Sequence, residues 1–494
     1  MPGRVGGLTA IAGALLAGHL SVPPTNSPSV APDPRPAAAP FAPLDPAVRV
    51  ADPAAVSSRL ARPLANPALG NSVGLVVDAL SGTMLLDRGS STAVAPASTL
   101  KTVIAAAALT TFDARATLTT RVFHTPPAST EPAGTEPAGT ESASTEDTGT
   151  ARVSNPAAPA GGGTLWLVGA GDPTLTAATG PAGYPSLARL SDLATQVRAA
   201  GITQVDRLVG DGTLFTGPST ATGWRDGYIT DGNVTPVSAL EVDGGRPTPG
   251  STGPRTTTPD LAAVNAFAAA LRRAGVQVTS TAVGAMPAGS MPAGSGSGST
   301  GSGGSGGPRQ IAAVRSPPIP LLVEQMLTYS DNDLAESLGR LVAHARGLPA
   351  SFDGATRAVL DILRELGVPT AGANLADTSG LSTSNQIAPA TLVALLRTAV
   401  LPGHPALRTL LTGLPVAGFS GTLNDRYGSP DTRAGAGDVR AKTGSLRIVT
   451  SLAGQVVDTN GRLLLFGFFA PVEEAGATRA ALDQVAVALA SCGC

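Results

Sequence analysis

The chain is poor in the residue types that several common functions require. Its 494 residues include two cysteines, and charged residues make up 14 % with a net charge of −2. Two cysteines are too few for a disulfide scaffold, and no basic field favours nucleic acid as a partner. The four histidines, His19, His124, His344 and His404, have neither ligand spacing nor a paired carboxylate. The sequence therefore predicts no metal, no cofactor and no Ser-His-Asp triad.

Lysine is scarcer still, because Lys101 and Lys442 are the only two in the sequence. Arginine keeps its proton inside a protein, whereas lysine can lose its proton when it is desolvated or lies beside another cation. The two lysines could have survived by chance. The motifs around them instead favour two sites that need a compact or titratable amine.

Lys101 ends the stretch Pro96-Ala97-Ser98-Thr99-Leu100-Lys101, which an apolar run follows at residues 102–109. Pro96 suits the first turn of a helix, and the run supplies helix-forming residues and a buried face. Ser98 and Lys101 would then share one face of the helix. A hydroxyl and an amine three residues apart can touch, as a serine nucleophile and its proton acceptor must.

Lys442 begins Lys442-Thr443-Gly444-Ser445, ahead of a β-rich run at residues 446–452. Between the two lysines, Ser330 and Asn332 form a Ser-x-Asn motif. The combination of S-x-x-K, S-x-N and K-T-G is typical of serine β-lactamases and penicillin-binding proteins. Each motif alone is weak evidence. All three occur in order and use both lysines, so together they are a strong signal.

The N-terminal region predicts export. Arg4 and the apolar residues 6–20 resemble a secretory signal, so we assign 1–22 to a signal peptide or anchor whose cleavage is open. This segment would make the only membrane contact, and the protein would act in the cell envelope outside the cytoplasm. Residues 23–57, rich in proline, alanine and serine, are predicted to form an extended spacer.

Strand patterns from both chain ends predict one α/β (α+β) domain, with an antiparallel sheet flanked by helices. One hairpin is predicted at residues 73–78 and 83–87, and a second at 447–457 and 462–470, around the turn Asn460-Gly461. Residues 473–490 are typical of a closing helix. Ser98 and Ser330 must meet although about 230 residues separate them, more than one ordinary domain. We therefore expect a domain of 58–113 and 310–494, interrupted by an α/β insert at 114–309 with low-complexity loops at 126–163 and 286–307.

Further segments carry a resemblance to a known family. They are residues 167–175 (LVGAGDPTL), 236–240 (PVSAL), 330–336 (SDNDLAE), 377–382 (DTSGLS) and 420–423 (SGTL). With the three motifs, they resemble the D-alanyl-D-alanine carboxypeptidases/endopeptidases, the class C low-molecular-mass penicillin-binding proteins, from about residue 58 to the C-terminus. The resemblance implies a DD-peptidase fold with inserted domains, peptidoglycan stem peptides as substrate, and β-lactam antibiotics as covalent inhibitors.

The resemblance also implies a role for each motif residue. Ser98 would attack the D-alanyl carbonyl and Lys101 would accept its proton, its pKa lowered by a nearby Lys442. Ser330 would relay a proton to the leaving D-alanine, and Asn332 would hold the substrate amide. Lys442 and Thr443 would bind the terminal carboxylate, and Gly444 would let the substrate backbone approach. The backbone N–H groups of Ser98 and Ser445 would form the oxyanion hole.

Two features leave alternatives open. Relatives often have arginine where this chain has Thr383, and some use it with the aspartate matching Asp172 to recognise the stem peptide's diamino acid. Asp172 is equally suited to cap the turn before Pro173. Cys492 and Cys494 could pair locally, pair with another molecule, or lie in an inert tail.

Two other functions compete with peptidase activity. A serine β-lactamase of the same fold would need efficient water activation, and no Glu-x-x-x-Asn signature lies in the expected interval. A non-catalytic peptidoglycan-binding module would not need the intact nucleophile or both lysines. The balance of carboxypeptidase and endopeptidase action, the stem-peptide preference and the oligomeric state stay open.

Overall fold

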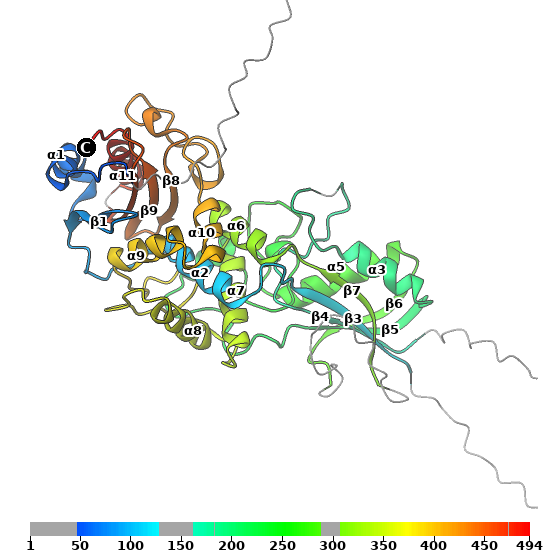
Figure 1. Ribbon diagram of the computed structural model, residues 1–494. Coiled ribbons are helices and arrows are strands. Elements are labelled where there is room, and N and C mark those ends of the chain that lie inside the picture. The colour runs from blue at the N-terminus through cyan, green and yellow to red at the C-terminus, as the bar shows by residue number, and fades with distance from the viewer. Residues whose placement is uncertain (1–46, 128–161, 182, 288–306, 473) are drawn as a thin grey trace, which may run out of the picture. The chain divides into compact units, whose positions relative to one another are not determined.

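The computed structural model describes residues 47–494 apart from 128–161, 182, 288–306 and 473 (Figure 1). These residues belong to one unit, Asp45–Cys494. The predicted signal at 1–22, most of the spacer and most of both low-complexity loops lie outside the described residues. Within the described residues no single helix is long and apolar enough to cross a membrane. Two segments, 389–400 and 405–412, reach that length only as a pair bent by 112°.

The first sheet is built from both ends of the chain, as predicted (Figure 1). Its order is β2 (Met84–Arg88), β1 (Val73–Asp78), β10 (Leu463–Pro471), β9 (Val449–Val457) and β8 (Arg440–Ser445), antiparallel throughout. Phe466 and Phe468 share one core with Leu60 of α1 (Pro53–Leu64) and Leu482 of α11 (Ala475–Ala490). A Cβ on Gly467, between the two phenylalanines, would lie 3.2 Å from Val393 of α9 (Pro389–Val400). The two-residue period of the strand therefore places helices on both faces.

A buried helix lies at the centre of the helical layer. This helix, α2 (Lys101–Thr111), is buried from Lys101 to Leu109. It contacts α6 (Ile319–Tyr329), α7 (Asn332–Ala345), α8 (Phe352–Glu365), α9 and α10 (Arg408–Thr412). Four successive alanines, residues 105–108, leave room for neighbouring helices to pack closely. The residues that precede α2 are consequently held from several sides.

A second, mixed sheet forms the predicted inserted α/β region. Its order is β6 (Gln277–Val283), β5 (Gln204–Asp211), β4 (Thr164–Val168), β3 (Thr119–Thr125) and β7 (Arg309–Arg315). The β4–β5 and β5–β6 pairs are parallel, and β3 is antiparallel to both neighbours. Apolar side chains of α3 (Leu190–Ala199) and α5 (Pro259–Arg273) pack against it, including Leu193 and Phe267. Because β7 pairs with β3, the inserted sheet reaches Arg315, beyond the boundary expected at 309.

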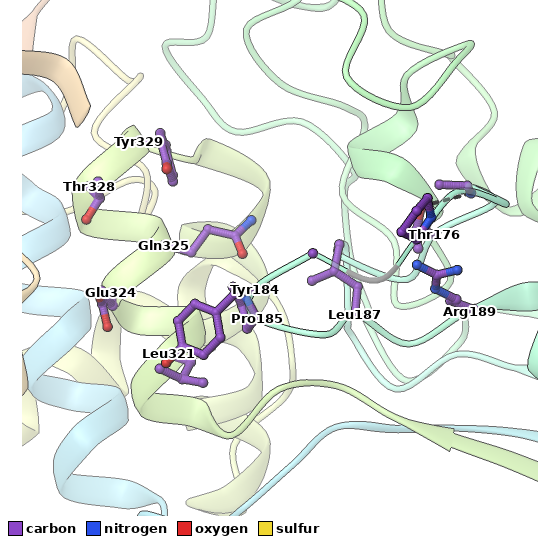
Figure 2. A pocket seen from close by; sticks show the side chains of 13 residues that line it. Thr176, Tyr184, Pro185, Leu187, Arg189, Leu321, Glu324, Gln325, Thr328 and Tyr329 are labelled. Carbon is purple, nitrogen blue, oxygen red and sulfur yellow. Dashed lines mark hydrogen bonds between the residues drawn. The ribbon is translucent and has the colours of Figure 1, made fainter. Parts of the chain in front are cut away.

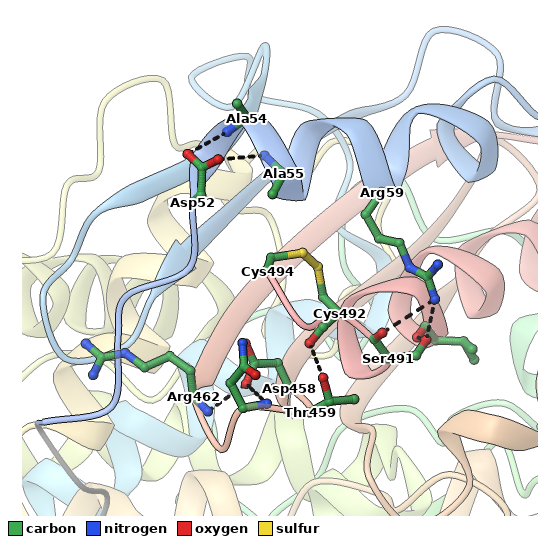
Figure 3. Close-up of a disulfide and its surroundings, with 12 residues drawn as sticks. Asp52, Ala54, Ala55, Arg59, Asp458, Thr459, Arg462, Ser491, Cys492 and Cys494 are labelled. Atoms are coloured by element: carbon green, nitrogen blue, oxygen red, sulfur yellow. Dashed lines mark hydrogen bonds between the residues drawn. A yellow bond between two sulfur atoms is a disulfide. The ribbon is translucent and has the colours of Figure 1, made fainter.

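Both ends of the described chain are anchored to each other (Figure 3). Helix α1 begins at Pro53, inside the segment 23–57 that we expected to be a spacer. The Asp52 carboxylate caps it by accepting from the N–H groups of Ala54 and Ala55, both at 3.3 Å. The Asp52 N–H donates to the Cys494 carbonyl at 3.0 Å, and Cys492 and Cys494 form a local disulfide. Of the alternatives open for these cysteines, the structure shows the local pair.

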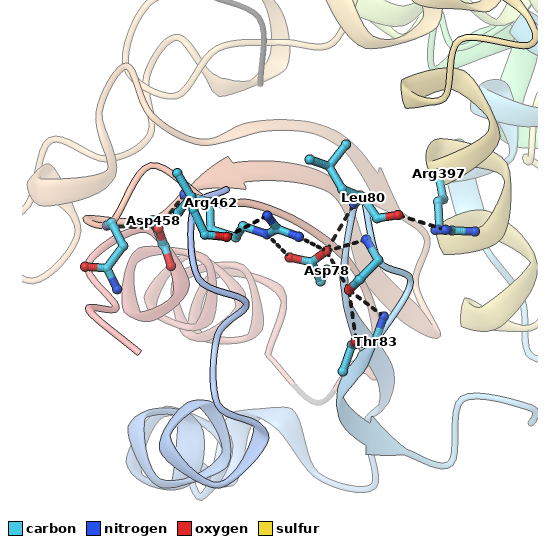
Figure 4. Close-up of polar contacts among 9 residues, drawn as sticks. Asp78, Leu80, Thr83, Arg397, Asp458 and Arg462 are labelled. Carbon is cyan, nitrogen blue, oxygen red and sulfur yellow. Dashed lines mark hydrogen bonds and ion pairs between the residues drawn. The ribbon is translucent and has the colours of Figure 1, made fainter. Parts of the chain in front are cut away.

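A buried ion pair joins the end of β1 to the β9–β10 turn (Figure 4). The Arg462 guanidinium donates to both carboxylate oxygens of Asp78, with an Nη2–Oδ1 distance of 2.7 Å. The Ser81 N–H and hydroxyl also donate to Asp78, at 2.7 and 2.8 Å. Burial acts to raise the pKa of Asp78, but the bonds from Arg462 and Ser81 outweigh it and hold that pKa below its ordinary value.

Candidate active site

Ser98 lies on a tight 3-10 turn, Ala97–Leu100, rather than in the regular helix that the sequence predicted. Ala97 has φ of +49°, a region that L-residues rarely adopt, so the turn is backbone-strained just before Ser98. The Thr99 hydroxyl donates to the Pro96 carbonyl at 2.7 Å and stabilises the turn. Helix α2 then begins at Lys101, whose Nζ lies 3.0 Å from Ser98 Oγ. The predicted contact of hydroxyl and amine is present.

The Lys101 amine is buried and surrounded by three oxygen atoms. Besides Ser98 Oγ, Nζ contacts Asn332 Oδ1 at 2.7 Å and the Ser379 carbonyl oxygen at 2.5 Å. The amide and carbonyl oxygens can only accept hydrogen bonds. A neutral amine has two hydrogens and one lone pair. With both hydrogens given to these two acceptors, its lone pair is left for the Ser98 hydroxyl.

The orientation of Asn332 is fixed by the inserted region. Asn332 Nδ2 donates to the Asn233 carbonyl at 2.8 Å, and a carbonyl cannot face the amide oxygen. Oδ1 must therefore face Lys101. Asn332 begins α7, with Asp331 as its N-cap, after a break at Ser330, whose φ is +59°. This left-handed residue lets α6 end and α7 start within three residues.

The next residue of α7 forms a second link to the insert. Asp333 is buried, and its Oδ1 accepts from the Thr235 N–H at 2.8 Å. Its Oδ2 lies 3.5 Å from Nη1 of Arg255. Burial and the charge of Asp331 raise the pKa of Asp333 to about 7, although Arg255 opposes them. We call the contacts of Asn233, Thr235 and Arg255 with α7 the insert latch.

The carbonyl of Ser379 belongs to a turn that two buried acids hold. Glu336 accepts from the Ser379 N–H at 2.7 Å, and Asp377 accepts from the Gly380 N–H at 2.9 Å and from Trp224 Nε1 at 2.7 Å. Gly380 has φ of +82°, and a Cβ there would lie 2.1 Å from the Ala97 carbonyl oxygen. The turn therefore packs directly on the strained residue before Ser98.

The sequence prediction missed both Ser379 and Glu336 as site residues. A backbone carbonyl carries no residue-type signal, so Ser379 could not be recognised from its side chain. Glu336 had a usable signal, because it lies four residues after Asn332 on α7 and so on the same face of the helix. Burial and Asp377 raise the pKa of Glu336 to about 7, with opposing hydrogen bonds from residues 378 and 379.

Both lysines have lowered pKa values. Burial lowers the pKa of Lys101 to about 8, against the opposing charges of Asp377, Glu336, Asp331 and Asp333. Burial, with the charges of Lys101 and Arg426, holds the pKa of Lys442 well below its ordinary range. The expectation that a neighbouring cation lowers the Lys101 pKa needs correction, because burial is the main cause there. The charge of Lys101 instead lowers the pKa of Lys442.

Strand β8 places the third motif at an open sheet edge. Beyond Ala441, whose N–H donates to the Pro415 carbonyl, the edge opposite β9 has no strand partner among the described residues. Lys442 Nζ donates to the Thr443 carbonyl at 2.9 Å, and the Thr443 hydroxyl donates to the Thr422 hydroxyl at 2.8 Å. An open edge can pair with an extended peptide.

Gly444 brings β8 close to the Ser98 turn. A Cβ at this position would lie 2.2 Å from Ser451 Oγ and 2.8 Å from the Pro96 carbonyl oxygen. Ser451 Oγ itself donates to that carbonyl at 2.6 Å. We expected a side chain here to block the substrate. The structure adds that such a side chain would collide with the turn that carries Ser98.

The remaining predicted residues make fewer contacts. Asp172 is buried, and its Oδ1 accepts from the Thr174 N–H at 2.9 Å and hydroxyl at 2.6 Å. Burial raises its pKa to about 6 against these two bonds. Thr383 is exposed. Within the described residues, neither Asp172 nor the Ser330 hydroxyl forms a hydrogen bond with Ser98, and no group of three or more His, Cys, Asp or Glu could hold a metal.

Comparisons with known proteins place the chain in a family and support its fold. A family model described as the D-Ala-D-Ala carboxypeptidase 3 (S13) family matches residues 56–134, 146–277 and 248–491. A carboxypeptidase of Mycobacterium tuberculosis is 38% identical over 473 residues, covering 94% of this chain and 90% of that protein. The carboxypeptidase DacB of Mycolicibacterium smegmatis is 39% identical over 473 residues, covering 93% and 90%. The crystal structure of penicillin binding protein 4 from Haemophilus influenzae has a TM-score of 0.65 at 22% identity, covering 89% of this chain and 98% of that one, and supports the fold.

Proposed function

The chain belongs to the D-Ala-D-Ala carboxypeptidase 3 (S13) family, and from this membership we propose that Ser98, Lys101, Ser330, Asn332 and Lys442 are its catalytic residues. The protein is a serine-type D-Ala-D-Ala carboxypeptidase that acts on peptidoglycan. The inserted α/β region and the three motifs are the features through which this chain would perform that activity.

The observation that carries the assignment is the set of contacts at the Lys101 amine. Two obligatory acceptors, Asn332 Oδ1 and the Ser379 carbonyl, direct the amine's lone pair to Ser98 Oγ at 3.0 Å. A pKa of about 8 keeps a useful fraction of the amine neutral near neutral pH. These are the requirements for a serine nucleophile and its general base.

The proposed reaction has two steps that share Ser98. Ser98 Oγ bonds to the carbonyl carbon of the penultimate D-alanine and passes its proton to Lys101, while N–H groups of Ser98 and Ser445 stabilise the oxyanion. The bond to the terminal D-alanine nitrogen then breaks as Ser330 relays a proton to that nitrogen. Water cleaves the resulting ester, releases the shortened peptide and restores the Ser98 hydroxyl.

The substrate is proposed to lie along the open edge of β8. Its backbone would pair with residues 443–445, its amide would contact Asn332, and its terminal carboxylate would bind Lys442 and Thr443. The bound carboxylate would raise the depressed pKa of Lys442 and favour its charged form. The absence of a side chain at Gly444 supports this arrangement, because it lets β8 lie close to the turn that carries Ser98. β-Lactams would acylate Ser98 in the same position.

The contacts of Asp172 support a turn cap rather than a substrate ligand, so the choice of stem-peptide side chain would rest on other residues. We propose that the protein works outside the cytoplasm, with residues 1–22 directing export and a spacer that ends before the cap residue Asp52.

The proposal is tested by incubating the full chain with fluorescent penicillin and then assaying D-alanine release from a peptide ending in D-Ala-D-Ala. We expect a stable label on the parent and on Ser58→Ala, an exposed serine of α1, and no label on Ser98→Ala. Rapid turnover of the penicillin without a stable label would favour a β-lactamase. If the folded parent shows no label and no turnover of the penicillin, the role of Ser98 is contradicted.

A further inference from the structure

A cavity of about 390 Å³ lies between the insert and helix α6 (Figure 2). The insert contributes the segment around Tyr184, Pro185 and Leu187. Helix α6 contributes Leu321, Gln325 and Tyr329. Tyr329 directly precedes Ser330 in the sequence. The cavity therefore adjoins the Ser-x-Asn motif on the side of the insert, and no residue of β8 lines it.

Two exposed aromatic rings border this cavity. The sequence has 16 aromatic residues, 10 Phe, 4 Tyr and 2 Trp, and burial of such side chains is strongly favoured. Tyr184 and Tyr329 nevertheless remain 87% and 70% exposed. They come from segments about 145 residues apart and line one cavity. Exposed apolar surface that converges on a cavity is typical of a binding site.

The cavity also offers polar groups that are free to bind a ligand. Within the described residues, the side chains of Glu324 and Gln325, which line the cavity, form no hydrogen bond. Arg189 is engaged, because its Nη1 donates to the Gly180 carbonyl at 2.6 Å. A free carboxylate, a free amide and two aromatic rings suit a ligand with an apolar face and a rim of hydroxyl and amide groups. A strongly anionic ligand would be repelled by Glu324.

We propose that this cavity is a subsite for amino-sugar rings of the glycan strand that carries the stem peptide. This inference rests on the proposed function, which makes peptidoglycan the substrate. A pyranose ring would lie against Tyr184 or Tyr329 through its C–H face. Its hydroxyl and N-acetyl groups would bond Glu324 and Gln325. An extended peptide already has its partner in the open edge of β8, whereas the sugar part of the substrate has none there.

The test compares D-alanine release from two substrates with the same peptide. One is the free pentapeptide ending in D-Ala-D-Ala, and the other carries the disaccharide of N-acetylated amino sugars. We expect the parent to have about a tenfold lower KM for the disaccharide form, equivalent to about 1.4 kcal/mol of binding. Tyr184→Ala should lose this preference and keep parental kinetics on the free peptide, while Tyr184→Phe keeps it. Leu261→Ala, an exposed apolar residue of α5, is the matched control.

Each other outcome has a distinct meaning. Equal KM values for both substrates in the parent would overturn the glycan subsite while leaving the peptidase function intact. If Tyr184→Ala raises KM equally for both substrates, the cavity binds the peptide instead, and the proposal is also overturned. Absence of D-alanine release from either substrate, with no penicillin label on the folded parent, would contradict the proposed function itself.

Discussion

The pKa of Lys101 sets an expected pH dependence for acylation of Ser98. Only the neutral amine can accept the serine proton, and the pKa is about 8. About one molecule in ten then carries the neutral amine at pH 7, and about one in a hundred at pH 6. The rate of labelling by fluorescent penicillin should therefore rise about tenfold per pH unit below 8 and become constant above about 9.

Asp331→Asn should move this profile to lower pH. The Asp331 carboxylate raises the Lys101 pKa, and its Oδ1 also caps α7 by accepting from the Leu334 N–H. Asparagine caps helices equally well, so the substitution removes a charge and keeps the fold. Asp331 is half-buried, and a partly solvated pair of charges interacts by about 1 kcal/mol. The midpoint should therefore fall by about half a pH unit to one.

The assay measures the second-order labelling rate of the parent and Asp331→Asn between pH 5.5 and 9.5. At pH 6.5 the variant should react about three to ten times faster, with an unchanged plateau above pH 9. Asp361→Asn, which removes an exposed carboxylate of α8, is the control and should match the parent. A rate that is flat with pH in the parent, or an Asp331→Asn midpoint at or above the parental one, would refute Lys101 as the base.

Three further changes probe the parts that hold the site. Gly444→Ala should slow penicillin labelling at least tenfold and cost about 1–3 kcal/mol in the free energy of unfolding, because its Cβ meets the Pro96 carbonyl. Gly403→Ala, with nothing within 4 Å, should change neither quantity. Asp333→Ala should remove the Thr235 and Arg255 contacts of the insert latch and lower kcat for D-alanine release about tenfold with little change in KM. Asp333→Asn, which still accepts from the Thr235 N–H, should recover part of the lost kcat. An unchanged kcat would show that the two Asp333 contacts do not help to position Asn332. Asp78→Asn should lower the free energy of unfolding by about 3 kcal/mol in denaturant titrations, because it leaves buried Arg462 unpaired. A loss below about 1 kcal/mol would contradict that assignment.

The sequence was sufficient to predict the first sheet and the pairing of Ser98 with Lys101, because both follow from short patterns. The Asn460-Gly461 turn defines one hairpin, and the three-residue spacing of Ser98 and Lys101 brings hydroxyl and amine together. The partners of Lys101 could be predicted less well. Two of the groups that orient this site are backbone carbonyls, those of Ser379 and Asn233, which any residue type could supply.

The limits of individual elements were harder to predict, for a different reason. The start of α1 at Pro53 lies in a segment whose proline and alanine content is typical of a spacer, and the cap from Asp52 is a single-residue signal. Strand β7 belongs to the inserted sheet because of its pairing with β3, which lies about 190 residues earlier in the chain. Long-range pairing of this kind leaves no local trace, whereas hairpin pairing does.

The sheet shared by the two chain ends sets the order in which the protein can mature. Val76 pairs with Phe466, so β1 is synthesised nearly 400 residues before its partner strand exists. Lys442, Gly444 and the disulfide tail that anchors Asp52 also come from the last part of the chain. A ribosome that stops early therefore releases a product without β8, the strand that carries Lys442 and Gly444. The site is therefore assembled only after β8, β9 and β10 have been synthesised, so a chain that lacks these strands cannot hydrolyse peptidoglycan.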